Sequence, residues 1–130
     1  MADLDRSLVY KTVATVLLGA LFIAAGINHF AHPAFYQQIV PPSFPSPALL
    51  VIISGVAEIA GGIGVFIPRT RNAAGIGLVL LLLAVFPANI YMAQHPELYR
   101  GIASATALYV RLPLQAVLIS WVWWVCFRRA

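Results

Sequence analysis

Apolar side chains dominate the chain in four long stretches, at about residues 8–28, 48–67, 72–92 and 105–127. Each stretch matches the roughly 20 helical residues that cross the hydrocarbon core of a bilayer. The third stretch contains no charged residue, and the only one in the second is Glu58. The pattern predicts an all-α fold, an integral membrane four-helix bundle, with residues 1–130 forming a single membrane domain.

The composition supports a membrane protein and excludes several other classes. Hydrophobic residues make up 62% and charged residues 9% of the 130 residues, and the mean hydropathy is +0.90. Because soluble domains carry about 25% charged residues, a soluble or disordered chain is excluded. Eight Lys and Arg against four Asp and Glu are too few for a face that follows phosphates, so we expect the lipid bilayer and no nucleic acid as partner. The single cysteine, Cys126, excludes an internal disulfide.

The positions of Lys and Arg predict how the four spans are oriented. Six of these residues fall on one side of the membrane and two on the other. The first group is Arg6, Lys11, Arg69, Arg71, Arg128 and Arg129, and the second is Arg100 and Arg111. Because cytoplasmic segments are enriched in Lys and Arg, we expect both termini in the cytoplasm and the 31–47 loop outside. The expected location is the cell inner (cytoplasmic) membrane, with a multi-pass topology.

Two connections on the outer side share a short motif. His32-Pro33-Ala34-Phe35-Tyr36 and His95-Pro96-Glu97-Leu98-Tyr99 have three identities in five and lie about half the chain apart. The match indicates two parallel helical-hairpin repeats, and chance similarity of a short motif is the alternative. Five prolines forbid a continuous helix through the 31–47 loop, in which we expect a short interfacial turn at 34–40.

Small and polar residues at helical spacing mark the faces on which the helices meet. In the second span these are Ser54, Gly55, Glu58, Gly61 and Gly62, and in the first span Thr12, Thr15, Gly19, Phe22, Gly26 and His29. Small residues let the backbones of two membrane helices approach closely. We therefore expect Glu58 to point into the bundle and not toward lipid.

Polar residues within the spans are the candidate functional site. A charge at mid-bilayer costs about 2.5–3.5 kcal/mol on insertion scales, so Glu58 needs a reason to be there. Six polar side chains fall in the outer half of the membrane: Asn28, His29, Glu58, Asn89, Arg111 and Gln115. We expect Glu58 and Arg111 to interact. The structural alternatives are an Arg111 that extends to the lipid head groups, and Asn28, His29 and Asn89 as helix caps or interhelical hydrogen bonds. No His-x-x-His or Glu-x-x-His spacing supports a metal site.

Blocks of sequence spread over nearly the whole chain match a known pattern. They are Asn28-His29-Phe30, His32-Pro33, Ile39-Val40-Pro41-Pro42, Ser54-Gly55-Val56-Ala57-Glu58-Ile59-Ala60-Gly61-Gly62-Ile63-Gly64, Phe86-Pro87-Ala88-Asn89-Ile90-Tyr91-Met92 and Arg111-Leu112-Pro113-Leu114-Gln115. The chain thereby resembles the DoxX-like family of small four-helix bacterial membrane proteins. The resemblance implies a role beside redox enzymes, as a subunit linked to quinone reduction or to protection from oxidative stress. It does not extend to thiol chemistry, because paired cysteines are missing.

Two functions remain open. The first is an accessory or assembly subunit associated with a membrane redox system, whose partner is a redox protein. The alternative is a protein or enzyme that binds an amphiphilic small molecule, quinone-like or lipid-like, at a buried polar site around Glu58 and Arg111. We expect no obligatory cofactor, with a quinone as the one candidate. A proton or ion pathway is the weakest hypothesis, because the inner half of the membrane offers only Lys11, Thr12 and Thr15.

Overall fold

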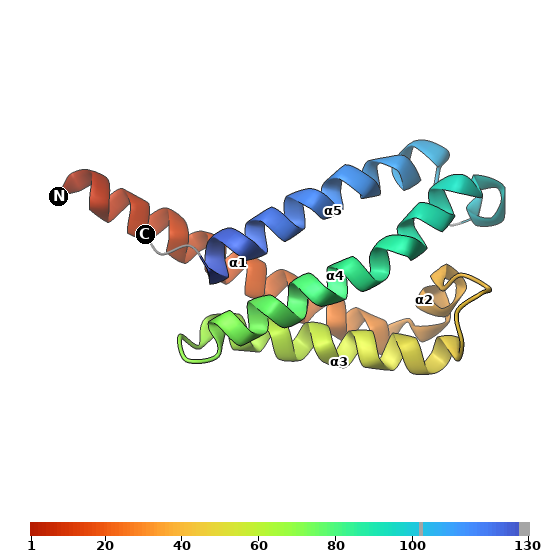
Figure 1. Cartoon of the computed structure of the whole chain (residues 1–130), viewed down its shortest axis with the longest axis horizontal. Coiled ribbons are helices and arrows are strands. Elements are labelled where there is room, and N and C mark those ends of the chain that lie inside the picture. Colours follow the sequence, from red (N-terminus) through yellow and green to blue (C-terminus); the bar gives the residue numbers. More distant parts are fainter. Residues whose placement is uncertain (102, 128–130) are drawn as a thin grey trace.

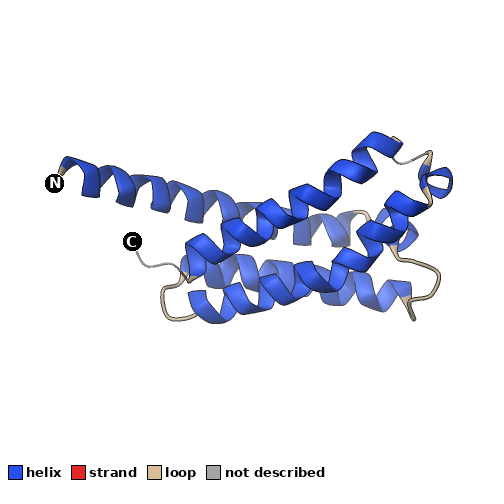
Figure 2. Cartoon of the chain, turned by 45° about the horizontal axis from the view of Figure 1, so that its top comes forward, coloured by secondary structure: helices blue, strands red, loops and turns tan. Residues whose placement is uncertain are grey.

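The computed structural model describes residues 1–101 and 103–127, and this part of the chain folds into helices joined by short connections (Figures 1 and 2). The elements are α1 (Ala2–Ala31), α2 (Pro33–Ile39), α3 (Pro47–Phe66), α4 (Arg71–Gln94), the 3₁₀ helix η1 (Pro96–Tyr99) and α5 (Ala105–Cys126). Four of them, α1, α3, α4 and α5, are long and apolar enough to cross a membrane. The predicted all-α four-helix fold is confirmed, and the turn expected at 34–40 is the short helix α2.

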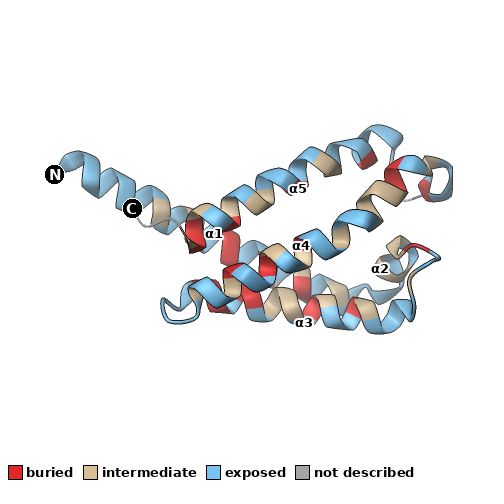
Figure 3. Ribbon diagram, in the orientation of Figure 1, coloured by how far each residue is buried: buried red, intermediate tan, exposed pale blue. Residues whose placement is uncertain are grey.

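Three of the four long helices begin and end within two residues of the predicted bounds, and α1 is the exception. It begins at Ala2, because Asp3 and Asp5 lie in its first turn, where the helix dipole favours acidic side chains. Its first nine residues, 2–10, are exposed, and this part of the helix extends beyond the other helices (Figure 3). Arg128 and Arg129, which contributed to the predicted orientation, lie outside the described residues.

The long helices form two hairpins that run in the same direction. Helix α1 packs along α3, helix α4 packs along α5, and the tight turn Ile67–Thr70 brings α3 and α4 side by side (Figure 1). We call the end of the bundle that carries α2 and η1 the α2 end, and the end that carries residues 67–70 the turn end. Helices α1 and α5 contact each other near the turn end and lie apart at the α2 end (Figures 1 and 2).

The repeated His-Pro motif also has a repeated conformation. His32 follows α1 with φ −132° and ψ 59°, and His95 follows α4 with φ −127° and ψ 56°. Each histidine precedes a proline that begins a short helix, which suits the fixed φ of proline. The two hairpins therefore make the same backbone turn at the same end of the bundle.

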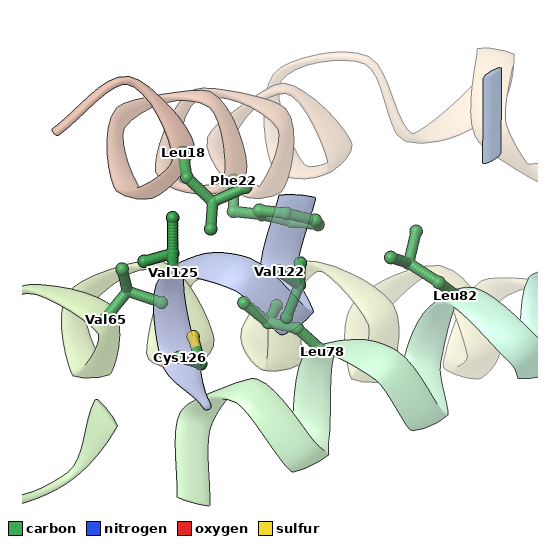
Figure 4. Close-up of a cluster of buried hydrophobic side chains, with 8 residues drawn as sticks. All are labelled: Leu18, Phe22, Val65, Leu78, Leu82, Val122, Val125 and Cys126. Carbon is green, nitrogen blue, oxygen red and sulfur yellow. The ribbon is translucent and has the colours of Figure 1, made fainter. Parts of the chain in front are cut away.

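The main core lies toward the turn end, where all four long helices meet. Its buried side chains are Leu18, Phe22, Val65, Leu78, Leu82, Val122, Val125 and Cys126 (Figure 4). The indole Nε1 of Trp121 donates to the carbonyl of Ala14 at 3.2 Å and ties α5 to α1. This core joins the two hairpins at one end and leaves room between them at the other.

Glycines set the close approach of α1 and α3. A Cβ added to Gly26 would lie 2.7 Å from the carbonyl oxygen of Gly55, and one added to Gly62 would lie 2.8 Å from that of Gly19. The predicted small-residue face of α3 is divided between two neighbours, since a Cβ on Gly61 would meet Leu78 of α4 at 2.5 Å. Helix α3 is therefore held between α1 and α4. Glu58 lies on α3 between Gly55, which contacts α1, and Gly61, which contacts α4.

Candidate functional site

A cavity of about 280 Å³ lies at the α2 end, and all five α-helices contribute to its wall. Four of the six predicted site residues line it: His29 of α1, Glu58 of α3, Asn89 of α4 and Arg111 of α5. Most of the other lining side chains are apolar. A mostly apolar cavity with a few polar groups is typical of small-molecule sites.

Glu58 is paired with a histidine of the neighbouring helix. Oε2 of Glu58 lies 3.2 Å from Nδ1 of His29, and the two side chains are 17% and 11% exposed. The same Nδ1 lies 2.7 Å from the carbonyl oxygen of Ala25, one turn earlier on α1. Oε2 of Glu58 is buried and has no hydrogen-bond partner within residues 1–101 and 103–127. The sequence-based expectation that Glu58 points into the bundle agrees with this position.

Arg111 faces the same cavity from the other hairpin. It is half-buried, and within the described part of the chain it forms no hydrogen bond or ion pair. The predicted pair between Glu58 and Arg111 is therefore not formed. The reason is the helix arrangement: α3 packs against α1 and α4, while α5 packs mainly on α4, so the cavity separates the two side chains.

Asn89 and Gln115 join α4 to α5 behind the cavity. Nδ2 of Asn89 donates to Oε1 of Gln115 at 2.6 Å, and Nε2 of Gln115 donates to the carbonyl of Leu82. Pro87 lies inside α4 and cannot donate to the carbonyl of Leu83, next to Leu82. The Gln115 bond goes to the carbonyl of Leu82 and therefore does not replace the hydrogen bond that Pro87 withholds from Leu83. Gln115 is 3% exposed and is not among the residues that line the cavity.

Asn28 lies outside the cavity and forms a hydrogen bond to a residue of α2. It is exposed, and its Nδ2 donates to the phenol oxygen of Tyr36 at 2.6 Å. The ring of Tyr36 stacks on His29, with centroids 3.9 Å apart and an interplanar angle of 16°. The sequence predicted only an interfacial turn at 34–40, and the position of Tyr36 in the wall of the cavity was not anticipated. The His-Pro-x-x-Tyr motif is the signal that marks it.

The connection from α2 to α3 also borders the cavity. Val40, Pro41 and Phe44 lie in its wall, and Pro41 is buried. These residues lie within the proline-rich 31–47 loop, through which the sequence pattern predicted no continuous helix. They reach the cavity because the connection folds back between the end of α2 and the beginning of α3. No local sequence pattern predicts this path.

Comparison with known proteins gives one match. Residues 18–126 match a family described as a domain of unknown function, DUF8561. No curated protein and no solved structure matches the chain. The expected membership of the DoxX-like family is wrong, because the family that matches is a different one. Small residues let membrane helices of many families pack closely, so this pattern does not by itself identify a family. The chain belongs to the DUF8561 family.

Proposed function

We propose that this protein is a membrane protein that binds one small amphiphilic molecule in the cavity at the α2 end. The observation that carries the proposal is a pair of unsatisfied polar groups on opposite hairpins. Arg111 lacks an acceptor and Oε2 of Glu58 lacks a donor within the described chain, and both border one cavity. Unpaired polar groups are costly in an apolar environment, so a ligand that satisfies both would gain affinity from each.

The side chains that line the cavity indicate which chemical groups the ligand carries. Its polar head accepts hydrogen bonds from the guanidinium of Arg111 and donates one to the carboxyl group of Glu58. Its apolar part lies against side chains such as Leu50, Val51 and Val85. A hydroxylated or acidic head on an acyl chain meets these conditions, and so does a quinol, which donates and accepts through its ring oxygens.

The orientation in the membrane is part of the proposal. The excess of Lys and Arg at the turn end favours an inner (cytoplasmic) membrane protein with both termini in the cytoplasm. The cavity would then lie in the outer half of the bilayer, where an amphiphile can enter with its head near the head-group region.

A second function, an accessory subunit that docks on a membrane redox protein, is favoured by a different observation. Residues 2–10 of α1 extend beyond the bundle, and Leu4, Leu8 and Tyr10 are 66%, 56% and 67% exposed. An exposed segment that combines these apolar side chains with the charged Asp3, Asp5 and Arg6 suits contact with another protein near the membrane surface. Deletion of residues 2–10 would release a docked partner and leave the molecule in the cavity bound.

The ligand hypothesis is tested on the full chain purified in mild detergent. Native mass spectrometry should detect a bound molecule of constant mass, which solvent extraction would release for identification. Glu58→Gln keeps the shape of the side chain and removes its charge, and Arg111→Gln removes the cation. Both should lose the molecule, whereas Glu97→Gln and Arg100→Gln, which alter exposed residues outside the cavity, should keep it.

The same variants can be compared with defined probes. Decanol, the monoanion of decyl phosphate and a short-chain benzoquinol each carry an O–H donor and an acceptor and differ mainly in their heads, so the thermal stabilisation that each gives ranks the head groups. Equal stabilisation of the wild type and Glu58→Gln by every probe would show that the buried acid has a structural role, and would contradict the proposal.

A further inference from the structure

A second cavity lies at the turn end, away from the first. Its volume is about 320 Å³, and it is formed by the first half of α1 together with the end of α3 and the start of α4. Lys11 and Arg71 line it, and none of the described residues in its wall is acidic. The hydroxyl-bearing side chain of Thr12 adds a hydrogen-bonding group beside the two cations.

Arg71 is held in place with part of its hydrogen-bonding capacity unused. Its Nε donates to the carbonyl of Val65 at 2.7 Å, which fixes the half-buried guanidinium across the turn between α3 and α4. Within residues 1–101 and 103–127 its terminal nitrogens have no acceptor. Arg71 is also the first residue of α4, a 24-residue helix whose dipole places partial positive charge at this end.

The remaining wall of this cavity is apolar and open to the surroundings of the bundle. Leu8, Val16 and Phe66 line it and are 56%, 48% and 40% exposed. Cationic and apolar surfaces are therefore contiguous, near the level at which the spans end and lipid head groups begin. A ligand that fits must carry an anionic group and an apolar chain.

We propose that this cavity binds an anionic phospholipid, with its phosphate between Lys11 and Arg71 and one acyl chain along Leu8, Val16 and Phe66. Basic pockets between membrane helices at the head-group level are known to bind lipids of this class. The guanidinium of Arg71 donates two hydrogen bonds to phosphate oxygens, a geometry that suits its planar fork. Binding here would clamp α1 to the α3–α4 turn and so stabilise the helix contacts that build the core.

The test uses delipidated full-length protein in mild detergent, titrated with phosphatidylglycerol or phosphatidylcholine of identical acyl chains, with bound lipid counted by native mass spectrometry. Phosphatidylglycerol should bind more tightly to the wild type. Arg71→Gln and Lys11→Gln should each weaken that binding about fivefold, the effect of one cation at a membrane surface. Arg69→Gln is the matched control, because this exposed arginine lies two residues away and does not line the cavity. The affinity of Arg69→Gln for phosphatidylglycerol should equal that of the wild type.

Three outcomes would overturn the proposal. They are equal affinity of the wild type for the two lipids, an equal loss of phosphatidylglycerol affinity in Arg69→Gln and Arg71→Gln, or a thermal stabilisation of the protein by inorganic phosphate alone that equals the stabilisation by phosphatidylglycerol. The first two would show that no specific site exists, and the third would show that the acyl chain contributes nothing. If Arg71→Gln fails to fold, Arg71→Lys takes its place, since it keeps the charge and loses the paired donors. It should bind more weakly than the wild type and still prefer phosphatidylglycerol.

Discussion

Nδ1 of His29 on α1 lies 3.2 Å from Oε2 of Glu58 on α3, and 2.7 Å from the carbonyl oxygen of Ala25. Because a carbonyl can only accept, Nδ1 must carry a hydrogen to make the second contact. The carboxylate therefore lies beside an N–H that is already used and receives no well-aligned hydrogen bond from it. The pair orients Glu58 toward the cavity and leaves Oε2 available to a donor from a ligand.

His29 is expected to have two separable roles. His29→Phe keeps a ring to stack on Tyr36 and removes the N–H beside Glu58, so the bound molecule should be held more weakly while α2 stays packed. His29→Ala removes the stack as well, and should lower the free energy of local opening of α2 by about 0.5–1.5 kcal/mol. Hydrogen exchange of the amides of residues 33–40 measures the second effect, and native mass spectrometry the first. Unchanged binding in His29→Phe would show that the contact with Glu58 is unimportant for the ligand.

Gln115 should matter for stability and not for the chemistry of the cavity. Gln115→Leu leaves Asn89 and the carbonyl of Leu82 without their partner on α5. Interhelical hydrogen bonds in membranes contribute about 0.6 kcal/mol on average and up to about 1.7 kcal/mol, and we expect a loss in this range on unfolding in mixed detergent. Ser120→Ala is the control, because that exposed hydroxyl bonds only to a carbonyl of its own helix. An equal effect of both variants would refute the role of Gln115.

The contact between α1 and α3 depends on Gly26. In Gly26→Ala the new methyl group would lie 2.7 Å from the carbonyl oxygen of Gly55, which belongs to the backbone and cannot rotate away. We expect a destabilisation of about 1–3 kcal/mol, the usual cost of overpacking. Gly77→Ala is the matched control, because nothing lies within 4 Å of its added Cβ. It should be neutral or slightly stabilising, since alanine favours the helix.

The proposed orientation predicts which engineered cysteines are accessible from outside the cell. Ser43→Cys in the connection before α3 should react with a membrane-impermeant thiol reagent on intact cells. Asn72→Cys in the first turn of α4 should react only after the membrane is permeabilised. Both positions are exposed on the protein, and the native Cys126 is buried, so background labelling should be low. The reverse pattern would place both termini outside.

Much of the fold could be predicted from local patterns. The four spans follow from the length of each apolar stretch, and prolines near the ends of α1 and α3 explain where those helices stop. The buried seam of α1 through Thr15, Gly19 and Gly26 was also predictable, because small residues at helical spacing leave a helix only one face for close packing. The family could not be inferred in this way, since such patterns follow from the general physics of helix packing.

The sequence by itself determined which residues share a helix face and how far along its helix each one lies, because the period and rise of an α-helix are fixed. Only the tertiary structure decided which faces meet. The rotation of each helix and the order of neighbours depend on how four helices pack together. That packing paired Glu58 with His29 instead of Arg111, and turned Asn28 outward to Tyr36. It also buried Gln115 behind Asn89, leaving Glu58 and Arg111 on opposite sides of one cavity.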